Sequence, residues 1–282
     1  MTNPHATAGA AFLIRTLTPA DDLSGIMAVQ YATWGHADAV VPHQIIAAMR
    51  NGGIVIGAYA GTRMVGFSYG FPGYKDGKAY LCSHMLAVLP EYRYNGLGRQ
   101  MKLAQRQAAL EKGYDLVTWT YDPLQAPNAR LNLSKLGAIV RTYVPDYYGA
   151  MSDAINAGLP SDRFVVEWHL QSARVIAAAA GGPLRAAPTW MDAPHVNDGD
   201  IKSEGMWPEL GRGSPRLVVL IPAQFQAVKE QDLALAQQWR KLTREIFLHY
   251  FARGYAATDF WADARYGYYL LEHGDPLAGA GF

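Results

Sequence analysis

The chain has 282 residues, of which half are apolar and 17% charged, and its formal net charge at pH 7 is +1. This length exceeds the roughly 100 to 200 residues of a typical domain, and the apolar content is enough for a buried core. A charge balance this close to neutral creates no long-range field to attract nucleic acid or an anionic membrane. We therefore expect one large or two modest globular domains that bind neither nucleic acid nor membranes.

The single cysteine, Cys82, excludes a disulfide framework within the chain and suits a reducing compartment. The first residues lack the basic segment and long apolar run of a secretory leader. No run approaches the roughly 20 apolar residues that span a bilayer. These features predict a cytoplasmic protein.

The first half of the chain alternates between strand and helix patterns. Short apolar runs bounded by glycine or proline predict strands, and amphipathic runs opened by Thr, Asp or Pro and closed by Gly predict helices. In chain order these are a strand at 12–17, helices at 21–34 and 42–53, strands at 54–60, 64–72 and 79–90, a helix at 98–112, a strand at 115–123, a helix at 127–137, and strands at 138–149 and 163–170. The order predicts an α/β fold in which helices cover both faces of a mixed sheet.

The second half changes in composition. Residues 171–215 are rich in Ala, Gly and Pro, which predicts a linker with a long excursion. Within it, HVNDGD at 195–200 has metal-binding side chains without the spacing of an EF-hand or zincin, so we expect a solvated loop and no metal site. Residues 216–282 predict strand, helix (231–253) and strand, which is the order of residues 80–120 and hints at a decayed duplication. The predicted division is a catalytic domain at 10–170, a linker at 171–215 and a C-terminal half at 216–282.

A glycine loop, RYNGLG at 93–98, lies between a predicted strand and a helix N-terminus. Unpaired N–H groups and the helix dipole at such a point hold anions, and glycine lets the backbone approach phosphate oxygens. A simple turn is the alternative interpretation. The loop lacks the third glycine of a dinucleotide fingerprint and the Gly-Lys-Ser/Thr of a P-loop, which argues against NAD and ATP.

The segment LAVLPEYRYNGLGRQM at 86–101 resembles the acyl-CoA-binding motif of the GNAT N-acyltransferase superfamily, Q/R-x-x-G-x-G/A. Arg93, Gly96 and Gly98 occupy the fixed positions of that motif. The later run NARLNLSKLGA at 128–138 extends the match in order and spacing, and the resemblance covers roughly residues 12–170.

The resemblance implies that acetyl-CoA, or another acyl-CoA such as succinyl-CoA, is the co-substrate. Main-chain amides of the loop would hold its pyrophosphate, and the strands at 81–88 and 116–121 would separate to admit the pantetheine arm. Asn128 would contact that arm, although a helix N-cap describes it equally well. The implied coenzyme-binding residues are Leu86, Ala87, Val88, Arg93, Tyr94, Asn95, Gly96, Leu97, Gly98, Arg99 and Asn128.

His84 is the candidate general base, because its ordinary pKa of about 6.5 suits proton transfer near neutrality. On a regular strand it points the same way as Leu86 and Val88, towards the predicted cleft. A core histidine bonded to a neighbour is the alternative. Cys82 shares a strand face with His84 and is expected to be a small core residue, not a covalent nucleophile.

The general acid is less clear. Many relatives carry a tyrosine four residues before the glycine that closes the helix at 127–137, and this chain has Leu133 there. Tyr143 and Tyr148, with Tyr147, are the nearby candidates, and aromatic packing is the alternative for each. A thiolate that leaves unprotonated would need no acid.

The segment after the first strand usually borders the acceptor in this superfamily. Tyr31, Trp34 and His36 there, with Tyr69, form an amphipathic wall that suits a small amine such as an amino acid or an arylalkylamine. Two other functions stay open: a CoA-binding module without catalysis, suggested by Leu133, and a nucleotide-binding α/β enzyme. The sequence does not decide the oligomeric state.

Overall fold

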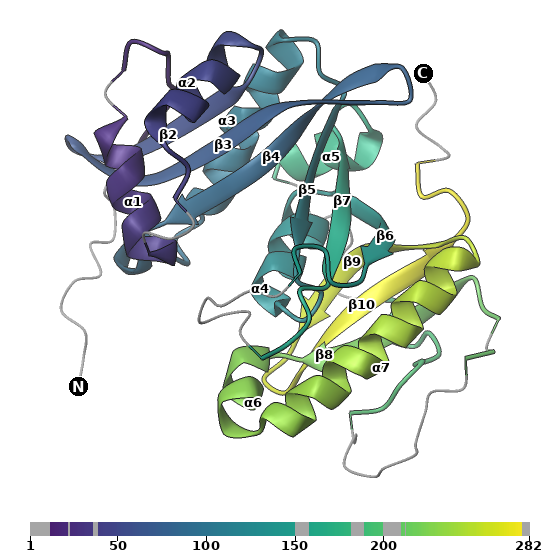
Figure 1. The fold of residues 1–282 in the computed structure, drawn as a ribbon. Coiled ribbons are helices and arrows are strands. Elements are labelled where there is room, and N and C mark those ends of the chain that lie inside the picture. The colour runs from purple at the N-terminus through teal and green to yellow at the C-terminus, as the bar shows by residue number, and fades with distance from the viewer. Residues whose placement is uncertain are drawn as a thin grey trace. The chain divides into compact units, whose positions relative to one another are not determined.

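The structure is a computed structural model, and it describes residues 12–21, 23–35, 39–149, 158–181, 189–199, 210–211 and 213–277. Packing divides the chain at Val117/Thr118 into two compact units, which are described separately (Figure 1). The sequence-based division into a catalytic domain (10–170), a linker (171–215) and a C-terminal half (216–282) has different boundaries and stays a prediction.

In the part of unit 1 that the structure describes, four antiparallel strands form a meander in the order β1-β2-β3-β4. Helix α3 packs on one face of this sheet and α1 and α2 on the other, where the rings of Trp34 and Phe67 meet edge-on. The elements are β1 (Leu13–Thr16), α1 (Ser24–Trp34), α2 (Pro42–Arg50), β2 (Ile54–Ala60), β3 (Arg63–Lys75), β4 (Lys78–Val88), the short 3-10 turn η1 (Pro90–Tyr92) and α3 (Leu97–Glu111).

A β-bulge interrupts the pairing of β3 with β4. Tyr69 lies opposite Met85 and Gly70 lies opposite Ser83, so that His84 is an extra residue on β4. An extra residue reverses the inward and outward alternation beyond it. The bulge therefore decides which face of the sheet receives His84.

The described residues of unit 2 form six strands in the order β5-β7-β6-β9-β10-β8. The two halves of this unit share one order of elements: a strand, then helices, then two further strands. In each half the last strand lies between the first two in the sheet, so that β7 lies between β5 and β6, and β10 lies between β9 and β8. The elements are β5 (Leu116–Tyr121), α4 (Ala126–Ala129), the π-helical turn η2 (Arg130–Lys135), β6 (Ile139–Val144), β7 (Arg163–His169), α5 (Ala173–Ala179), β8 (Arg216–Pro222), α6 (Phe225–Gln231), α7 (Leu233–Ala252), β9 (Tyr255–Ala262) and β10 (Tyr266–His273). The observed repeat thus matches residues 216–273 with 116–169, whereas the sequence suggested a match with 80–120.

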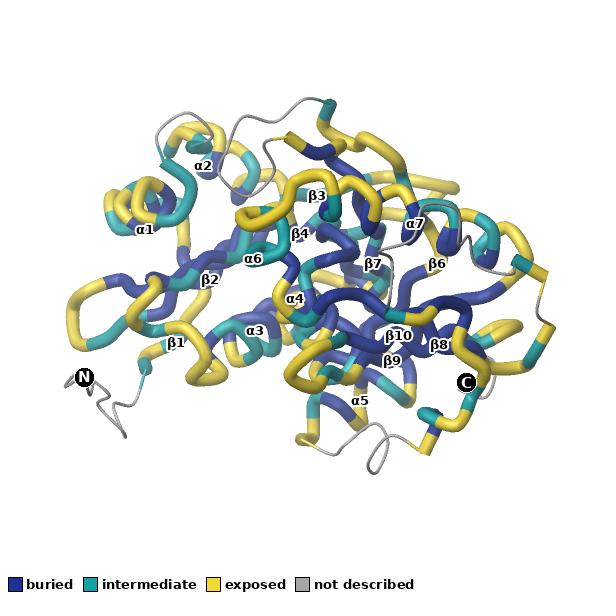
Figure 2. The backbone as a smooth tube through the Cα atoms, turned by 90° about the horizontal axis from the view of Figure 1, so that it is seen from below, coloured by how far each residue is buried: buried dark blue, intermediate teal, exposed yellow. Residues whose placement is uncertain are grey.

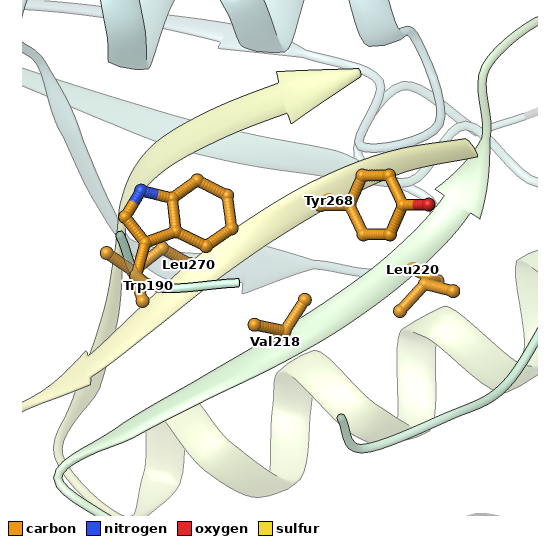
Figure 3. Packing of buried hydrophobic residues seen from close by; sticks show 5 residues of the cluster. All are labelled: Trp190, Val218, Leu220, Tyr268 and Leu270. Atoms are coloured by element: carbon orange, nitrogen blue, oxygen red, sulfur yellow. The ribbon is translucent and has the colours of Figure 1, made fainter. Parts of the chain in front are cut away.

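Two layers cover the sheet of unit 2. On one face Phe247 of α7 packs against Phe164 and Tyr269, with ring centroids 4.6 and 5.4 Å apart. On the other face Trp190 packs with side chains from β8 and β10 (Figure 3): Val218, Leu220, Tyr268 and Leu270. Strands β8, β9 and β10 are consequently buried along most of their length (Figure 2).

Residues 194–197 close the outer edge of β8. Val196 N–H donates to Val218 O (2.8 Å) and Val218 N–H donates to Pro194 O (2.9 Å). The Asn197 amide completes this pairing, because its Nδ2 donates to Leu220 O (3.0 Å) and its Oδ1 accepts from Leu220 N–H (2.9 Å). Val196 and Asn197 are buried, so the expectation of a solvated loop at 195–200 is wrong for these residues.

The strands and helices predicted for residues 12–170 are confirmed, with ends shifted by a few residues. The sequence reading missed α5 within the expected linker, α6, and β10. The helix expected at 127–137 divides into α4 and the π-helical η2.

Candidate functional site

The glycine loop is held in a left-handed turn just before α3. Tyr94 has φ 65° and Gly96 has φ 77°, and Gly96 is the N-cap of the helix that begins at Leu97. Glycine adopts this conformation without strain, whereas most side chains do not. The turn follows η1 and leads directly into α3.

The loop offers backbone donors for an anion. The first intrahelical hydrogen bond of α3 runs from Gln100 N–H to Gly96 O (3.1 Å), so the amides of Leu97 and Gly98 precede the helical ladder. Among the described residues no side chain caps this helix end, and Asn95 and Gly96 are exposed. The geometry and the helix dipole suit a phosphate group.

Arg93 braces the loop. Its Nε donates to Val88 O at 2.9 Å, which ties the loop back to the last residue of β4. Arg93 is exposed and Arg99 is half-buried. Arg93 thus fixes the loop against the strand that carries His84.

His84 lies on the sheet face opposite α3. Its ring packs against Tyr69 and Phe71, at centroid distances of 6.2 and 5.6 Å. Leu86 lies opposite Ser68, whose side chain faces α3, so the expectation that His84 points the same way as Leu86 and Val88 is wrong. The bulge at His84 is the physical reason.

The imidazole of His84 has one side in solvent and the other against aromatic rings. This partial burial lowers the pKa of His84 below its ordinary 6.5, so the ring is neutral at pH 7. A neutral imidazole that reaches solvent can accept a proton. The position is therefore compatible with a general base.

We expect kcat/KM of the wild type to fall as the pH drops below 6.5, because protonated His84 cannot accept a proton. His84→Ala should lower kcat/KM by about 100-fold or more and abolish this acid limb. Initial rates between pH 5 and 9 measure both, and Cys82→Ala, on the same face of β4, serves as the control that keeps the limb. An acid limb that persists unchanged in His84→Ala would remove His84 from the mechanism.

Cys82 does not resemble a reactive thiol. It is half-buried, and burial raises the pKa of its thiol. A raised pKa keeps the sulfur protonated and poorly nucleophilic. The expectation of a small packing residue is in accord with this environment.

Sequence reasoning missed Lys102 and Gln105 of α3, which are 2% and 0% exposed. Lysine and glutamine side chains usually face water, so the residue type alone does not predict their burial. Their spacing carried the signal: Leu97, Met101, Gln105 and Ala108 recur at helical periodicity on one buried stripe, and Lys102 lies beside it.

Tyr143 is a buried structural link in unit 2. Its hydroxyl donates to Asp162, which also accepts two hydrogen bonds from Arg244 (2.8 and 2.6 Å). Burial and the adjacent Asp162 charge raise the pKa of Tyr143 well above its ordinary value. Burial alone would raise the pKa of Asp162, but the hydrogen bonds from Arg244 and Tyr143 outweigh it and lower that pKa. This engagement does not favour Tyr143 as a proton donor to substrate.

Tyr148 has the more accessible hydroxyl. Its side chain is exposed, its hydroxyl lies 3.0 Å from Thr120 Oγ1, and the Arg163 guanidinium lies 5.3 Å from its ring centre. Leu133, at the position where relatives carry tyrosine, is fully buried. Tyr148 as general acid stays a prediction.

Asn128 lies inside α4 with an exposed side chain, and Gln125 is the N-cap of that helix. The N-cap alternative for Asn128 is therefore wrong. Its contact with the coenzyme arm stays a prediction.

The four predicted acceptor residues differ in placement. Tyr69 is buried beside His84, Trp34 is half-buried against Phe67, and Tyr31 is 38% exposed on α1. His36 lies outside the described residues. Of the three acceptor residues that the structure describes, Tyr69 is the one whose ring packs against His84.

Among the residues that the structure describes, two features of other protein classes are absent. No cluster of three or more His, Cys, Asp or Glu side chains there is arranged to hold a metal ion. Within the same ranges, every helix is too short or too polar to cross a membrane.

Comparison with known proteins finds a family match over part of the chain. Residues 22–137 match the acetyltransferase (GNAT) family. None of the curated proteins matches the chain. The matched range contains the glycine loop, His84 and the helix α3.

Several solved structures of acetyltransferases are similar to part of this chain. A putative GNAT acetyltransferase from Desulfovibrio desulfuricans is 17% identical, with 57% of this chain and 99% of that chain covered and a TM-score of 0.45. The putative acetyltransferase yncA from Salmonella typhimurium, solved with acetyl-CoA, is 16% identical over 57% and 95%, with a TM-score of 0.45. An aminoglycoside acetyltransferase from an uncultured soil sample is 20% identical over 40% and 78%, with a TM-score of 0.36.

Proposed function

On the premise that residues 22–137 form a domain of the acetyltransferase (GNAT) family, we propose that the chain transfers an acyl group from acyl-CoA to the amine of a small molecule. Acetyl-CoA-dependent acyl transfer is the activity of the family, and acetyl is the default acyl group. The observation that carries the proposal is the glycine loop: amides that precede the hydrogen-bond ladder of α3, next to the exposed left-handed turn at Gly96 and within the matched range.

The loop supports coenzyme binding by backbone donors. The N–H groups of Leu97 and Gly98 would bind the pyrophosphate of coenzyme A together with the positive end of the α3 dipole. This grip would set the position of the thioester along β4, because Arg93 ties the loop to Val88. Binding energy spent here orients the reacting group.

His84 supports direct attack in a ternary complex. Its neutral imidazole would take a proton from the acceptor ammonium, and the free amine would attack the thioester carbonyl carbon. The new C–N bond forms as the C–S bond breaks and the electron pair leaves with the thiolate, while the attacking nitrogen releases its second proton to solvent and becomes a neutral amide. Tyr148 is the proposed donor of a proton to that thiolate, without a covalent intermediate on Cys82.

The surroundings of His84 suit an acceptor with an apolar body. The rings of Tyr69 and Phe71 pack against the imidazole of His84. An amino acid or an arylalkylamine is therefore the proposed acceptor class, with Tyr31 and Trp34 as further contacts.

The test is release of free thiol from acetyl-CoA across a panel of small amines, with calorimetry of CoA and of ATP in parallel. We expect CoA to bind, ATP not to bind, and at least one amine to release thiol. Binding of CoA without turnover of any amine would favour a non-catalytic CoA-binding module. Binding of ATP alone would contradict the proposal.

A further inference from the structure

Four polar side chains are buried between α3 and the sheet of unit 1. Lys102 and Gln105 come from α3, Ser68 from β3 and Ser83 from β4, and none is more than 5% exposed. Polar groups at such depth cost free energy unless their hydrogen bonds are made.

These side chains form one network. Lys102 Nζ donates to Ser83 Oγ (3.1 Å) and to Gln105 Oε1 (2.9 Å). Ser83 Oγ donates to Gln105 Oε1 (2.9 Å), and Gln105 Nε2 donates to Ser68 Oγ (2.9 Å). One helix is thereby bonded to two strands at once.

The two strand anchors lie on either side of the bulge at His84. Ser83, directly before the extra residue, pairs with Gly70, and Leu86, two residues after it, pairs with Ser68. The network therefore fixes the stretch of β3 and β4 in which the alternation reverses. The orientation of His84 depends on that register.

The same helix carries the glycine loop. Lys102 follows the first residue of α3, Leu97, by five positions, which is about 7.5 Å along the axis. A helix transmits position over such a length with little bending. The network thus joins the anion-binding end of α3 to the strand that holds His84.

Apolar side chains would pack α3 on the sheet at a lower desolvation cost, so stability alone does not account for a buried amine here. Apolar packing tolerates small slides, whereas a network of directed hydrogen bonds is satisfied in one arrangement. The hydrogen bonds of this cluster therefore suit a role in fixing the register of α3 on β3 and β4.

We infer that Lys102 and Gln105 are positioning residues, which lock α3 to the bulged strands so that a thioester held by the glycine loop meets His84. The catalytic part of this inference rests on the proposed acyl transfer. The structural part, control of the bulge by the network, stands independently of it.

Lys102→Met is the principal test. It keeps the length of the side chain, and Gln105 keeps its bonds to Ser83 and Ser68. We expect kcat to fall by about 10- to 100-fold while the KM for acetyl-CoA and the Kd for CoA change by less than about threefold, because alignment is lost and binding is not. Amide hydrogen exchange at residues 82–86 should accelerate in the same variant.

Two further variants separate positioning from general packing. Ser83→Ala should reproduce the loss of kcat and the faster exchange, and Ser83→Thr, which keeps a hydroxyl, should restore both towards wild type. Met101→Leu, on the same buried face of α3 but outside the network, should leave kcat and exchange at 82–86 unchanged.

Unchanged kcat in Lys102→Met, unchanged exchange at 82–86, or equal effects in Met101→Leu would each overturn the inference. If the wild-type chain transfers no acyl group, the proposed function fails by itself. The exchange measurement on these variants then still decides whether the network controls the bulge.

Discussion

Gly96→Asp is expected to weaken binding of CoA by about 100-fold or more, since a carboxylate a few ångströms from a diphosphate repels it by several kcal/mol at the effective dielectric of a protein surface. The fold should survive, because no atom of the described residues lies within 4 Å of a Cβ at Gly96 and Asp is among the residues that tolerate a left-handed φ. A negative charge at a helix N-terminus also interacts favourably with the dipole. Calorimetry of CoA binding with a thermal denaturation of each variant measures both effects.

Matched variants isolate the charge at the loop. Gly96→Asn has the same shape without the charge and should lose far less affinity. Gly77→Asp adds the same charge at the same φ of 77° with the same open space, but at the β3–β4 turn, at the far end of β4 from the loop, and should bind CoA normally. The difference in affinity between Gly96→Asp and Gly96→Asn should shrink as salt is raised. Wild-type affinity in a folded Gly96→Asp variant would remove the loop from the binding site.

Arg240→Met is expected to lower the free energy of unfolding by about 3–5 kcal/mol, because it leaves the carboxylate of Asp122 buried without its counter-charge. The two side chains form a bidentate pair at 2.8 and 2.5 Å and are 3% and 8% exposed. Burial alone would lower the pKa of Arg240, but the charge and hydrogen bonds of Asp122 outweigh it and raise that pKa. Urea denaturation followed by fluorescence measures the change.

The double variant Asp122→Asn with Arg240→Met should recover most of the loss, since the neutral amide can still accept the hydrogen bond from Leu124 N–H (2.9 Å). Arg63→Met, which breaks an exposed pair with Glu91 at 3.1 Å, should cost only about 0–1 kcal/mol. A cost for Arg240→Met as small as that for Arg63→Met would contradict the buried pair.

Structural features that depend only on neighbouring residues in the sequence could be predicted. Apolar periodicity gave the strands and helices of residues 12–170, and the glycine loop could be placed before α3, because the left-handed turn at Gly96 and the helix start depend on neighbouring residues. The match of residues 22–137 to the acetyltransferase (GNAT) family agrees with the resemblance seen in the loop.

Features that depend on distant partners could not be predicted. The direction of His84 follows from how β4 registers on β3, and one extra residue reverses it. Tyr143 looked available in the sequence, but its hydroxyl is taken by Asp162, which Arg244 holds from 82 positions away. Burial of Lys102 likewise depends on the strands on which α3 packs.

The pairing of Asn197 with Leu220 has a consequence for self-association. An outermost strand whose N–H and C=O groups are open is a template on which another chain can add a strand and start aggregation. At β8 the side chain of Asn197 imitates a peptide group and occupies both hydrogen-bonding groups of Leu220. The Asn197 side chain thus protects the edge of the sheet at this point. A strand from another chain could pair with Leu220 only after displacing the Asn197 amide.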